Sequence, residues 1–279
     1  MKKILVAVDF SKGSIRALTY AIKLANVLKS DILMTFVLKP DSNDSLYSNS
    51  HDKIIEEVTT RFEDLITLHK KDLKGGNISY KIREGKIHTE IANQAKYSDC
   101  DLIITGTHGV SGFEEFWIGS NARRIVTSAP CSVITIRYDF CPTKTINKII
   151  LPIDSSLDTR QKVPITCDIA EVFGAEIHIV ITSNSVSDKK IAKSYAKQTI
   201  DYIESRGMKP IVVETSKKPL EVIEYAKKVG ADLISIMTEQ EVSTISLLLG
   251  ASAEQVVTHS PIPVLSVHPK DLYNITGGL

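Results

Sequence analysis

The sequence predicts an α/β protein made of two tandem copies of one domain, each a five-stranded parallel open sheet with helices on both faces. Two observations carry this prediction. Short, nearly continuous apolar runs alternate with segments of helical periodicity, which is typical of strands buried on both faces and joined by helical crossovers. The second half of the chain also repeats residues of the first half at nearly constant offsets.

The elements of the first copy can be assigned in order from periodicity and turn residues. Ile15, Leu18 and Ile22 fall on one face of a first helix, and two consecutive glycines end a second helix. The second copy repeats the same order of elements through residue 268. In the first copy we expect strands at residues 4–8, 32–38, 78–83, 102–105 and 132–137, and later helices at 52–73, 89–98 and 121–128.

The two copies match at two different offsets. Asp9 and Asp154 each follow an apolar run, at an offset of 154 − 9 = 145, whereas Asp101 and Asp232 match at 232 − 101 = 131. The second copy therefore lacks 145 − 131 = 14 residues between its second and third strands. A long loop costs little chain entropy, so this difference leaves the fold unchanged. We place the domains at residues 1–139 and 146–279, joined by a polar, turn-prone linker at about 138–147.

Composition limits the classes of function. The 279 residues are 43% hydrophobic and 24% charged with a net charge of +1, so we expect neither nucleic acid nor a membrane as a partner. The apolar run at residues 4–8 is too short for a secretory signal, and no stretch approaches a membrane span. We therefore expect a cytoplasmic protein. The 4 cysteines lack metal-binding spacing and are interpreted as small apolar side chains.

The most informative segment is Gly106-x₂-Gly109-x₉-Gly119-Ser120, which follows an apolar strand and leads into a helix that begins near Asn121. Glycines allow a ligand to approach the backbone closely. A helix start offers unpaired N–H groups and the positive end of the helix dipole, which suits phosphate oxygens. We expect the amides of Gly109, Gly119, Ser120 and Asn121 to line the path of a polyphosphate.

Other candidate residues lie at the same edge of the predicted sheet. In an open parallel sheet, ligands bind beyond the carboxyl ends of the strands. Asp9, Val37 and the loop after Gly106 all lie at such ends, so one crevice can hold all three. Asp9 can accept hydrogen bonds from an adenine amino group or a ribose hydroxyl, and Val37 can flank a flat base. His108 is a further candidate for phosphate contact.

These residues resemble the nucleotide motif of the universal stress protein family, G-x₂-G-x₉-G followed by Ser or Thr, and the resemblance covers both halves of the chain. Asp9 matches the Asp with which the family contacts the base. The resemblance implies a fold like that of the adenine nucleotide alpha hydrolases, and ATP as the ligand, with or without Mg²⁺ or Mn²⁺. It also implies that domains pair through their last strands, here as an internal pseudo-dimer, and it leaves a homodimer of chains open. Ala122 departs from the family, which often has a hydroxyl at that position.

The second copy departs from the motif much further. Residues 237–240 read Met-Thr-Glu-Gln and replace the first two glycines, and Ala251 stands where Ser120 does. Thr182 occupies the position of Val37. Glu239 would also place negative charge near any phosphate, at a cost of about 1 kcal/mol if poorly screened. We therefore expect the second copy to bind no ATP.

The candidate residues also have purely structural interpretations. Gly106 and Gly109 could form only a tight strand-to-helix turn. Asp9 could cap the first helix, and the presence of Asp154 in a copy without the glycines favours that reading. His108 could be a solvated loop side chain.

Binding is favoured over catalysis. The Walker lysine motif and the SGGxDS loop of ATP pyrophosphatases are both absent, so we expect no enzyme, with weak ATPase activity left open. We interpret the chain as an ATP-binding regulatory protein of the stress response, with an unknown protein partner and nucleotide bound in the N-terminal copy only. The alternatives are a nucleotide-independent interaction scaffold with both sites vestigial, and a slow adenine-nucleotide hydrolase.

Overall fold

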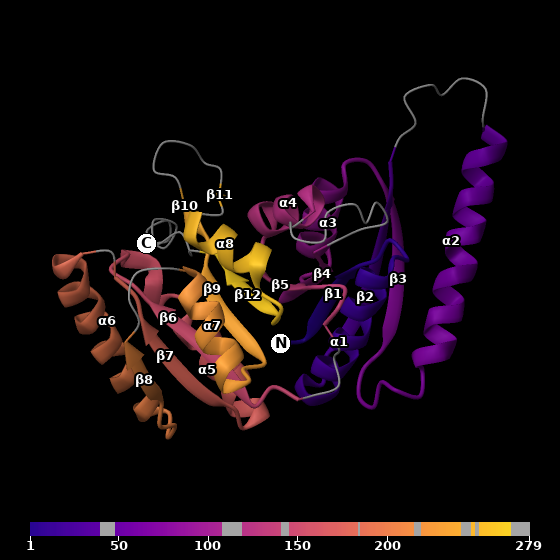
Figure 1. Cartoon of the computed structure of the whole chain (residues 1–279). Coiled ribbons are helices and arrows are strands. Elements are labelled where there is room, and N and C mark those ends of the chain that lie inside the picture. Colours follow the sequence, from indigo (N-terminus) through magenta and orange to yellow (C-terminus); the bar gives the residue numbers. More distant parts are fainter. Residues whose placement is uncertain are drawn as a thin grey trace, which may run out of the picture. The chain divides into compact units, whose positions relative to one another are not determined.

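The computed structural model describes residues 1–39, 48–107, 119–140, 145–183, 185–214, 219–240, 247–248 and 251–268. The chain divides into two compact units, Met1–Thr143 and Lys144–Leu279, which we call unit 1 and unit 2 (Figure 1). Each unit contributes five parallel strands and its own helices, so the predicted fold class of two tandem α/β copies is confirmed.

Unit 1 follows the predicted order of elements. Its helices are α1 (Lys12–Leu28), α2 (Ser48–His69), α3 (Ile87–Tyr97) and α4 (Ser120–Ser128). Its strands lie in the order β3-β2-β1-β4-β5 and pair in parallel. Because β1 lies between β2 and β4, the strand order reverses beside its carboxyl end, which is where open sheets of this kind bind ligands. The strands are β1 (Lys3–Ala7), β2 (Asp31–Leu38), β3 (Ile78–Glu84), β4 (Leu102–Gly106) and β5 (Ser132–Ile136).

The centre of unit 1 is apolar, as its uninterrupted runs predict. Ile4, Leu5 and Val6 of β1 are fully buried, because crossover helices cover both faces of a parallel sheet. Right-handed crossovers place α1 and α2 on one face and α3 and α4 on the other. α1 buries Ala17 and Ala21, and these small side chains let the helix lie close to β4.

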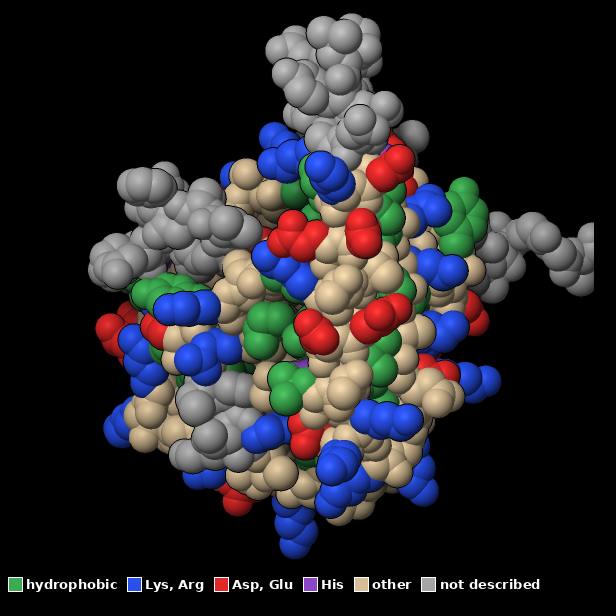
Figure 2. All heavy atoms as spheres, turned by 90° about the vertical axis from the view of Figure 1, so that its right-hand side faces the viewer, with side chains coloured by type: hydrophobic (Ala, Val, Ile, Leu, Met, Phe, Trp, Pro, Cys, Tyr) green, Lys and Arg blue, Asp and Glu red, His purple; other side chains and the backbone are tan. Residues whose placement is uncertain are grey.

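Helix α2 lies beside β3 at the edge of unit 1 (Figure 1). Among its described side chains Val58 and Phe62 are buried, and Phe62 stacks on Tyr80 of β3 with ring centroids 4.8 Å apart. Charged side chains of both signs cover the outer surface of the helix (Figure 2). α2 begins and ends four residues before the predicted 52–73, and the N–H groups of Asp72 and Leu73 then both donate to the carbonyl of His69.

Unit 2 repeats this architecture, with its strands in the order β12-β9-β6-β7-β8. A short antiparallel pair, β10 (Glu239–Gln240) with β11 (Leu247–Leu248), is additional to the predicted elements. Among the described residues no helix is long and apolar enough to cross a membrane. The other elements are β6 (Lys148–Ile153), the 3₁₀ helix η1 (Leu157–Arg160), α5 (Val163–Phe173), β7 (Glu176–Ile181), α6 (Val186–Ser205), β8 (Ile211–Glu214), α7 (Pro219–Val229), β9 (Leu233–Met237), α8 (Ala251–His259) and β12 (Val264–Val267).

One acidic residue ties two strands together in the same way in each unit. The Oδ2 atom of Asp101, before β4, accepts hydrogen bonds from the main-chain N–H groups of Lys2 and Lys3. The Oδ2 atom of Asp232, before β9, accepts from the N–H groups of Asn147 and Lys148. These two aspartates therefore match in structure as well as in sequence.

The first helix begins differently in the two units. In unit 1, α1 starts one residue after Ser11, whereas the matching residues of unit 2 form η1 and the α-helix begins only at Val163. Pro164 lies in the first turn of α5 and has no N–H to continue a helix from η1, so the break has a local cause. Phe140, in the expected linker, belongs to unit 1, because its carbonyl accepts a hydrogen bond from Arg16 of α1.

Candidate functional site

Asp9 lies just beyond the carboxyl end of β1 and holds the turn into α1. Its Oδ1 atom accepts a hydrogen bond from the N–H of Ser11 at 3.0 Å, and its own N–H donates to the Ser14 hydroxyl at 3.3 Å. The N-cap of α1 is Ser11, whose Oγ accepts from the N–H of Ser14 at 3.2 Å, so the suggestion that Asp9 caps the helix is wrong. The described structure assigns no hydrogen bond to the second carboxylate oxygen of Asp9.

Phe10 follows Asp9 with a φ of 60°, in the left-handed region. This conformation costs a residue with a Cβ atom roughly 1–2 kcal/mol. The Phe10 ring packs against Phe36 of β2 and Phe62 of α2, with centroids 5.7 and 5.1 Å away. Sequence analysis did not select Phe10, because its position in the turn gives no sign of the ring contacts that hold it.

Gly106 ends β4 and lies against the first turn of α1. A Cβ atom on Gly106 would lie 2.9 Å from the carbonyl carbon of Gly13 and 3.1 Å from its oxygen. Real Cβ atoms do not approach backbone this closely, so glycine is required for packing at this position. Gly106 therefore has a structural role whether or not a ligand binds.

The amino end of α4 meets the same edge of the sheet. Gly119 is the N-cap, with φ −58° and ψ 143°, and no side chain caps the helix there. Its N–H donates to the carbonyl of Thr107 at 2.6 Å, so this amide is already used within the protein. Ser120 and Asn121 are exposed in the first turn, where helix N–H groups have no partner within the helix. Of the four predicted phosphate-binding amides, these two fit that role in the described structure.

The described candidate residues converge on adjacent strands. β1 pairs with β2 and with β4, so Asp9 lies between the carboxyl ends that carry Val37 and Gly106. Val37 is half-buried and pairs in register with Arg83 of β3, whose guanidinium forms an ion pair with Glu90. His108 and Gly109 lie outside the described residues.

Positive charge surrounds the contact between α3 and α4. The pKa of His88, in α3, lies below its ordinary value because of partial burial and then because of the positive charges of Arg124 and Lys86. The Ser128 hydroxyl of α4 reaches the carbonyl of His88, which joins the two helices. This positive charge therefore lies near the carboxyl-terminal part of α4, where Ser128 meets His88.

The matching turn of unit 2 uses its aspartate differently. Asp154 Oδ1 accepts hydrogen bonds from both the N–H and the hydroxyl of Ser156, at 2.9 and 2.6 Å. Burial raises the pKa of Asp154, but the charge of Lys162 and the hydrogen bonds of Ser156 and Thr159 outweigh it, so the pKa lies below its ordinary value. The Oδ1 atom of Asp154 therefore carries two hydrogen bonds from its own unit.

Lys162 is a buried cation in the turn of unit 2, and Ala17 takes its place in unit 1. Its side chain is 3% exposed, and its Nζ donates to the carbonyl and hydroxyl of Thr159 at 2.6 and 3.1 Å. Burial lowers the pKa of Lys162 to about 8, against the opposing effect of Asp154. The Thr166 hydroxyl of α5 forms a hydrogen bond with Ser235 of β9, so further buried polar side chains lie next to Lys162.

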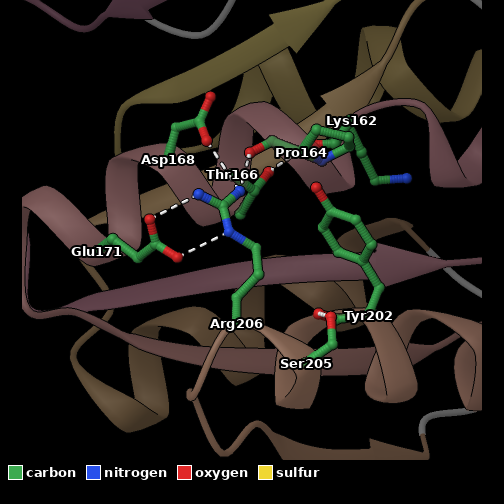
Figure 3. Close-up of polar contacts among 8 residues, drawn as sticks. All are labelled: Lys162, Pro164, Thr166, Asp168, Glu171, Tyr202, Ser205 and Arg206. Atoms are coloured by element: carbon green, nitrogen blue, oxygen red, sulfur yellow. Dashed lines mark hydrogen bonds and ion pairs between the residues drawn. The ribbon is translucent and has the colours of Figure 1, made fainter.

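A second polar cluster joins α6 to α5 and is separate from this buried lysine. Arg206, after α6, forms a two-pronged ion pair with Glu171 and a further hydrogen bond to Asp168 at 2.8 Å. Figure 3 shows the guanidinium between these carboxylates, while the Lys162 side chain extends away from them. We assign this cluster to the stability of unit 2.

The segment of unit 2 that replaces the first two glycines has backbone pairing of its own. Glu239 pairs with Leu248, and Gln240 with Leu247, in the short antiparallel ladder of β10 and β11. Main-chain groups used in such a ladder are unavailable to a ligand. The matching loop of unit 1, residues 108–118, lies outside the described residues.

The described cysteines fit the interpretation as small apolar side chains. Burial raises the pKa of Cys100 to about 11, that of Cys131 to about 12 and that of Cys167 to about 11, so their thiols stay protonated near neutral pH. Within the described ranges, no group of three or more His, Cys, Asp or Glu side chains is arranged to hold a metal ion.

Comparison with solved structures supports the fold of the whole chain. A universal stress protein from Archaeoglobus fulgidus superposes with a TM-score of 0.80 at 18% identity, over 96% of this chain and 98% of that one. A functionally unknown protein from Pseudomonas aeruginosa superposes with a TM-score of 0.67 at 18% identity, over 97% and 94% of the two chains. At this level of identity, both show the fold alone.

Sequence comparison finds relatives that match about half of this chain. A universal stress protein of Methanocaldococcus jannaschii is 27% identical over 139 residues, covering 49% of this chain and 82% of the relative. A relative in Staphylococcus epidermidis is 30% identical over 146 residues, covering 50% and 87%. The model of the universal stress protein family matches residues 1–137 and again 145–268. The chain therefore belongs to the universal stress protein family, as a member with two tandem copies of the family's domain.

Proposed function

We propose that this protein binds ATP in unit 1 only, hydrolyses it little or not at all, and acts as a nucleotide-responsive regulator in the cytoplasmic stress response. The ligand would lie beyond the carboxyl ends of β1, β2 and β4, with its base near Asp9 and Val37. Its phosphates would approach the exposed first turn of α4 at Ser120 and Asn121.

The observation that carries this proposal is the different use of the two aspartates. Among the described residues, the Asp9 carboxylate receives one hydrogen bond, from the N–H of Ser11 to Oδ1, so it can accept further hydrogen bonds from a ligand. The Oδ1 atom of Asp154 receives two hydrogen bonds from Ser156, and despite burial the charge of Lys162 helps to lower the pKa of Asp154. In the described structure Asp154 therefore has one more internal hydrogen bond than Asp9, together with the charge of Lys162, where unit 1 has Ala17.

The phosphate side of the site supports the same division. An uncapped helix start binds anions through its free N–H groups and its dipole, and α4 starts this way. Unit 2 has a β10–β11 ladder where unit 1 has its glycine loop. Ala251 also removes the hydroxyl that Ser120 could donate to a phosphate.

The two aspartates provide a matched test. In a calorimetric titration with ATP, we expect Asp9→Ala to lower the affinity by about 10-fold or more, which corresponds to about 1.4 kcal/mol for a hydrogen bond to a charged group. Asp154→Ala should leave the affinity unchanged. An equal effect of the two substitutions would contradict nucleotide binding in unit 1 alone.

A nucleotide-independent scaffold is the second candidate, and two observations favour it. Gly106 is required by its contact with Gly13, and the Asp–Ser turn is present in both units, so part of the motif has a structural explanation without a ligand. If the wild-type protein shows no heat of ATP binding and no thermal stabilisation by ATP, the scaffold becomes the better proposal.

The absence of turnover is a separate part of the proposal. The chain lacks the lysine motif with which phosphate-binding loops activate ATP. An ATPase assay with Mg²⁺ or Mn²⁺ should give less than about one turnover per minute, far below ordinary enzyme rates. Faster turnover that disappears in Asp9→Ala would reassign the protein as a hydrolase.

A further inference from the structure

The residue after Asp9 has a backbone conformation that the turn itself does not require. Among the described non-glycine residues, positive φ angles occur at Phe10, Lys29 and Asp99, and the latter two lie at helix carboxyl ends, where this conformation is common. Phe10 instead lies between β1 and α1, beside the proposed ligand. Such outliers persist only where surrounding structure holds them.

Three side chains from outside the turn hold the Phe10 ring. Phe36 of β2 and Phe62 of α2 contact it, and the Arg61 guanidinium lies over the ring, 5.4 Å from its centroid. Phe62 is 0% exposed and also stacks on Tyr80, so its own position is fixed. The buried anchor of α2 is therefore in direct contact with the turn that carries Asp9.

Unit 2 shows what this turn does without such a ring. Ser155 takes the place of Phe10 and is not among the residues with positive φ. The following serine then donates its hydroxyl to the aspartate, as Ser156 does to Asp154 at 2.6 Å. In unit 1 the Ser11 hydroxyl instead accepts from Ser14 and caps α1, which leaves the Asp9 carboxylate with one hydrogen bond from this turn.

We propose that Phe10 is a positioning residue for Asp9: its ring, held by α2 and β2, keeps the turn in the left-handed conformation that leaves the Asp9 carboxylate free for the nucleotide. The inference rests on the proposed function and extends it, because it makes α2 a support of the nucleotide site. Helix α2 and the nucleotide then stabilise each other's position, since a coupling between two sites is reciprocal.

Two substitutions at one position separate positioning from packing. Phe10→Gly and Phe10→Val both remove the ring, but glycine adopts the left-handed conformation freely whereas the β-branched valine resists it. We expect Phe10→Gly to lower ATP affinity by about 3-fold and Phe10→Val by about 30-fold, a ratio set by the cost of the left-handed backbone. Affinities that agree within about 2-fold would overturn the inference, because loss of packing alone affects both variants equally.

The role of α2 is tested through Phe62. Phe62→Leu keeps a buried apolar side chain and removes the ring that contacts Phe10. It should lower ATP affinity by about 3-fold or more in the wild-type background and have no further effect in Phe10→Gly, whose turn no longer depends on α2. Equal effects in the two backgrounds would show that Phe62 does not act through Phe10.

A measurement without nucleotide distinguishes failure of this inference from failure of the proposed function. The measurement is amide hydrogen exchange at Ser14. If the turn of Phe10→Val relaxes toward that of unit 2, the Ser14 N–H loses its acceptor, Ser11 Oγ. Its exchange with solvent should then be about 5-fold faster than in Phe10→Gly, as expected for one lost hydrogen bond. Equal Ser14 exchange in the two variants would refute the inference even if ATP binds. If ATP does not bind to the wild type, the proposed function fails, and this exchange ratio still decides what Phe10 does.

Discussion

The main chain of Gly106 lies against the main chain of Gly13, so close that a Cβ atom on Gly106 would meet the Gly13 carbonyl carbon at 2.9 Å. This contact brings the start of α1 against the carboxyl end of β4. At the matching offsets, unit 2 has Asp158 and Met237, and its helix begins later. Unit 2 therefore lacks both the pair of glycines and the early helix start that unit 1 has.

Gly106→Ala should destabilise unit 1. Either α1 or β4 must shift to accept the methyl group, and overpacking of this kind costs about 1–3 kcal/mol. The free energy of unfolding can be measured in urea, with Gly75→Ala as the control. Gly75 has open space around its Cα and no left-handed φ, so its substitution should change stability by less than about 0.5 kcal/mol. Equal effects of the two substitutions would contradict the packing role of Gly106.

Gly119→Val should strongly weaken ATP binding while the protein stays folded. The backbone angles at Gly119, −58° and 143°, are open to any residue, so the cost to stability should be no more than about 1 kcal/mol. The branched side chain would occupy the space in front of Ser120 and Asn121, and affinity should fall by about 30-fold or more, or about 2 kcal/mol. Gly250→Val, at the matching position of unit 2, is the control, and unchanged ATP binding in Gly119→Val would remove α4 from the site.

Lys162 should make the stability of the protein rise with pH in the alkaline range. Its pKa is about 8 when folded and ordinarily 10.5, so between these values the unfolded chain holds a proton that the folded chain does not. A difference of 10.5 − 8 = 2.5 units corresponds to at most about 3 kcal/mol gained between pH 8 and pH 10.5. The stability of Lys162→Met should not rise with pH in this range. The stability of Lys189→Met, which changes an exposed lysine, should rise as in the wild type. The same pH profile in Lys162→Met and wild type would contradict the buried charge.

Arg206→Ala should lower the urea midpoint of unit 2, because it leaves Glu171 and Asp168 without their shared cation. Arg206→Lys should have a urea midpoint close to that of Arg206→Ala, because an ammonium group cannot form the two-pronged contact with Glu171. If the interaction is an exposed ion pair, added salt should reduce the difference in urea midpoint between the wild type and the two variants. A full rescue by lysine would show that charge alone matters.

Much of the fold could be predicted from the sequence, because fully buried parallel strands leave uninterrupted apolar runs such as the one at residues 4–8. The copy-to-copy repeat then extended this assignment to unit 2. The late start of α5 was missed, although Pro164 gave a visible signal that a helix could not run through it. The β10–β11 pair was also missed, since two-residue strands leave no periodicity.

The site was harder to predict than the fold. The sequence pattern correctly predicted that Asp9, Val37 and Gly106 lie at the carboxyl ends of adjacent strands. It could not show that Ser11 is the helix cap, because Asp9 and Ser11 are both good capping residues. The conformation of Phe10 depends on Phe62, which lies more than fifty residues further along the chain, so no local pattern could reveal it.

The most direct test of the central claim is the number of ATP molecules bound per chain, measured by native mass spectrometry with ATP in excess. We predict one ATP per chain in the wild type and in Asp154→Ala, and a much smaller bound fraction in Gly119→Val. Two ATP molecules per wild-type chain would contradict the assignment of unit 2 as nucleotide-free, and no bound ATP would contradict the assignment of unit 1.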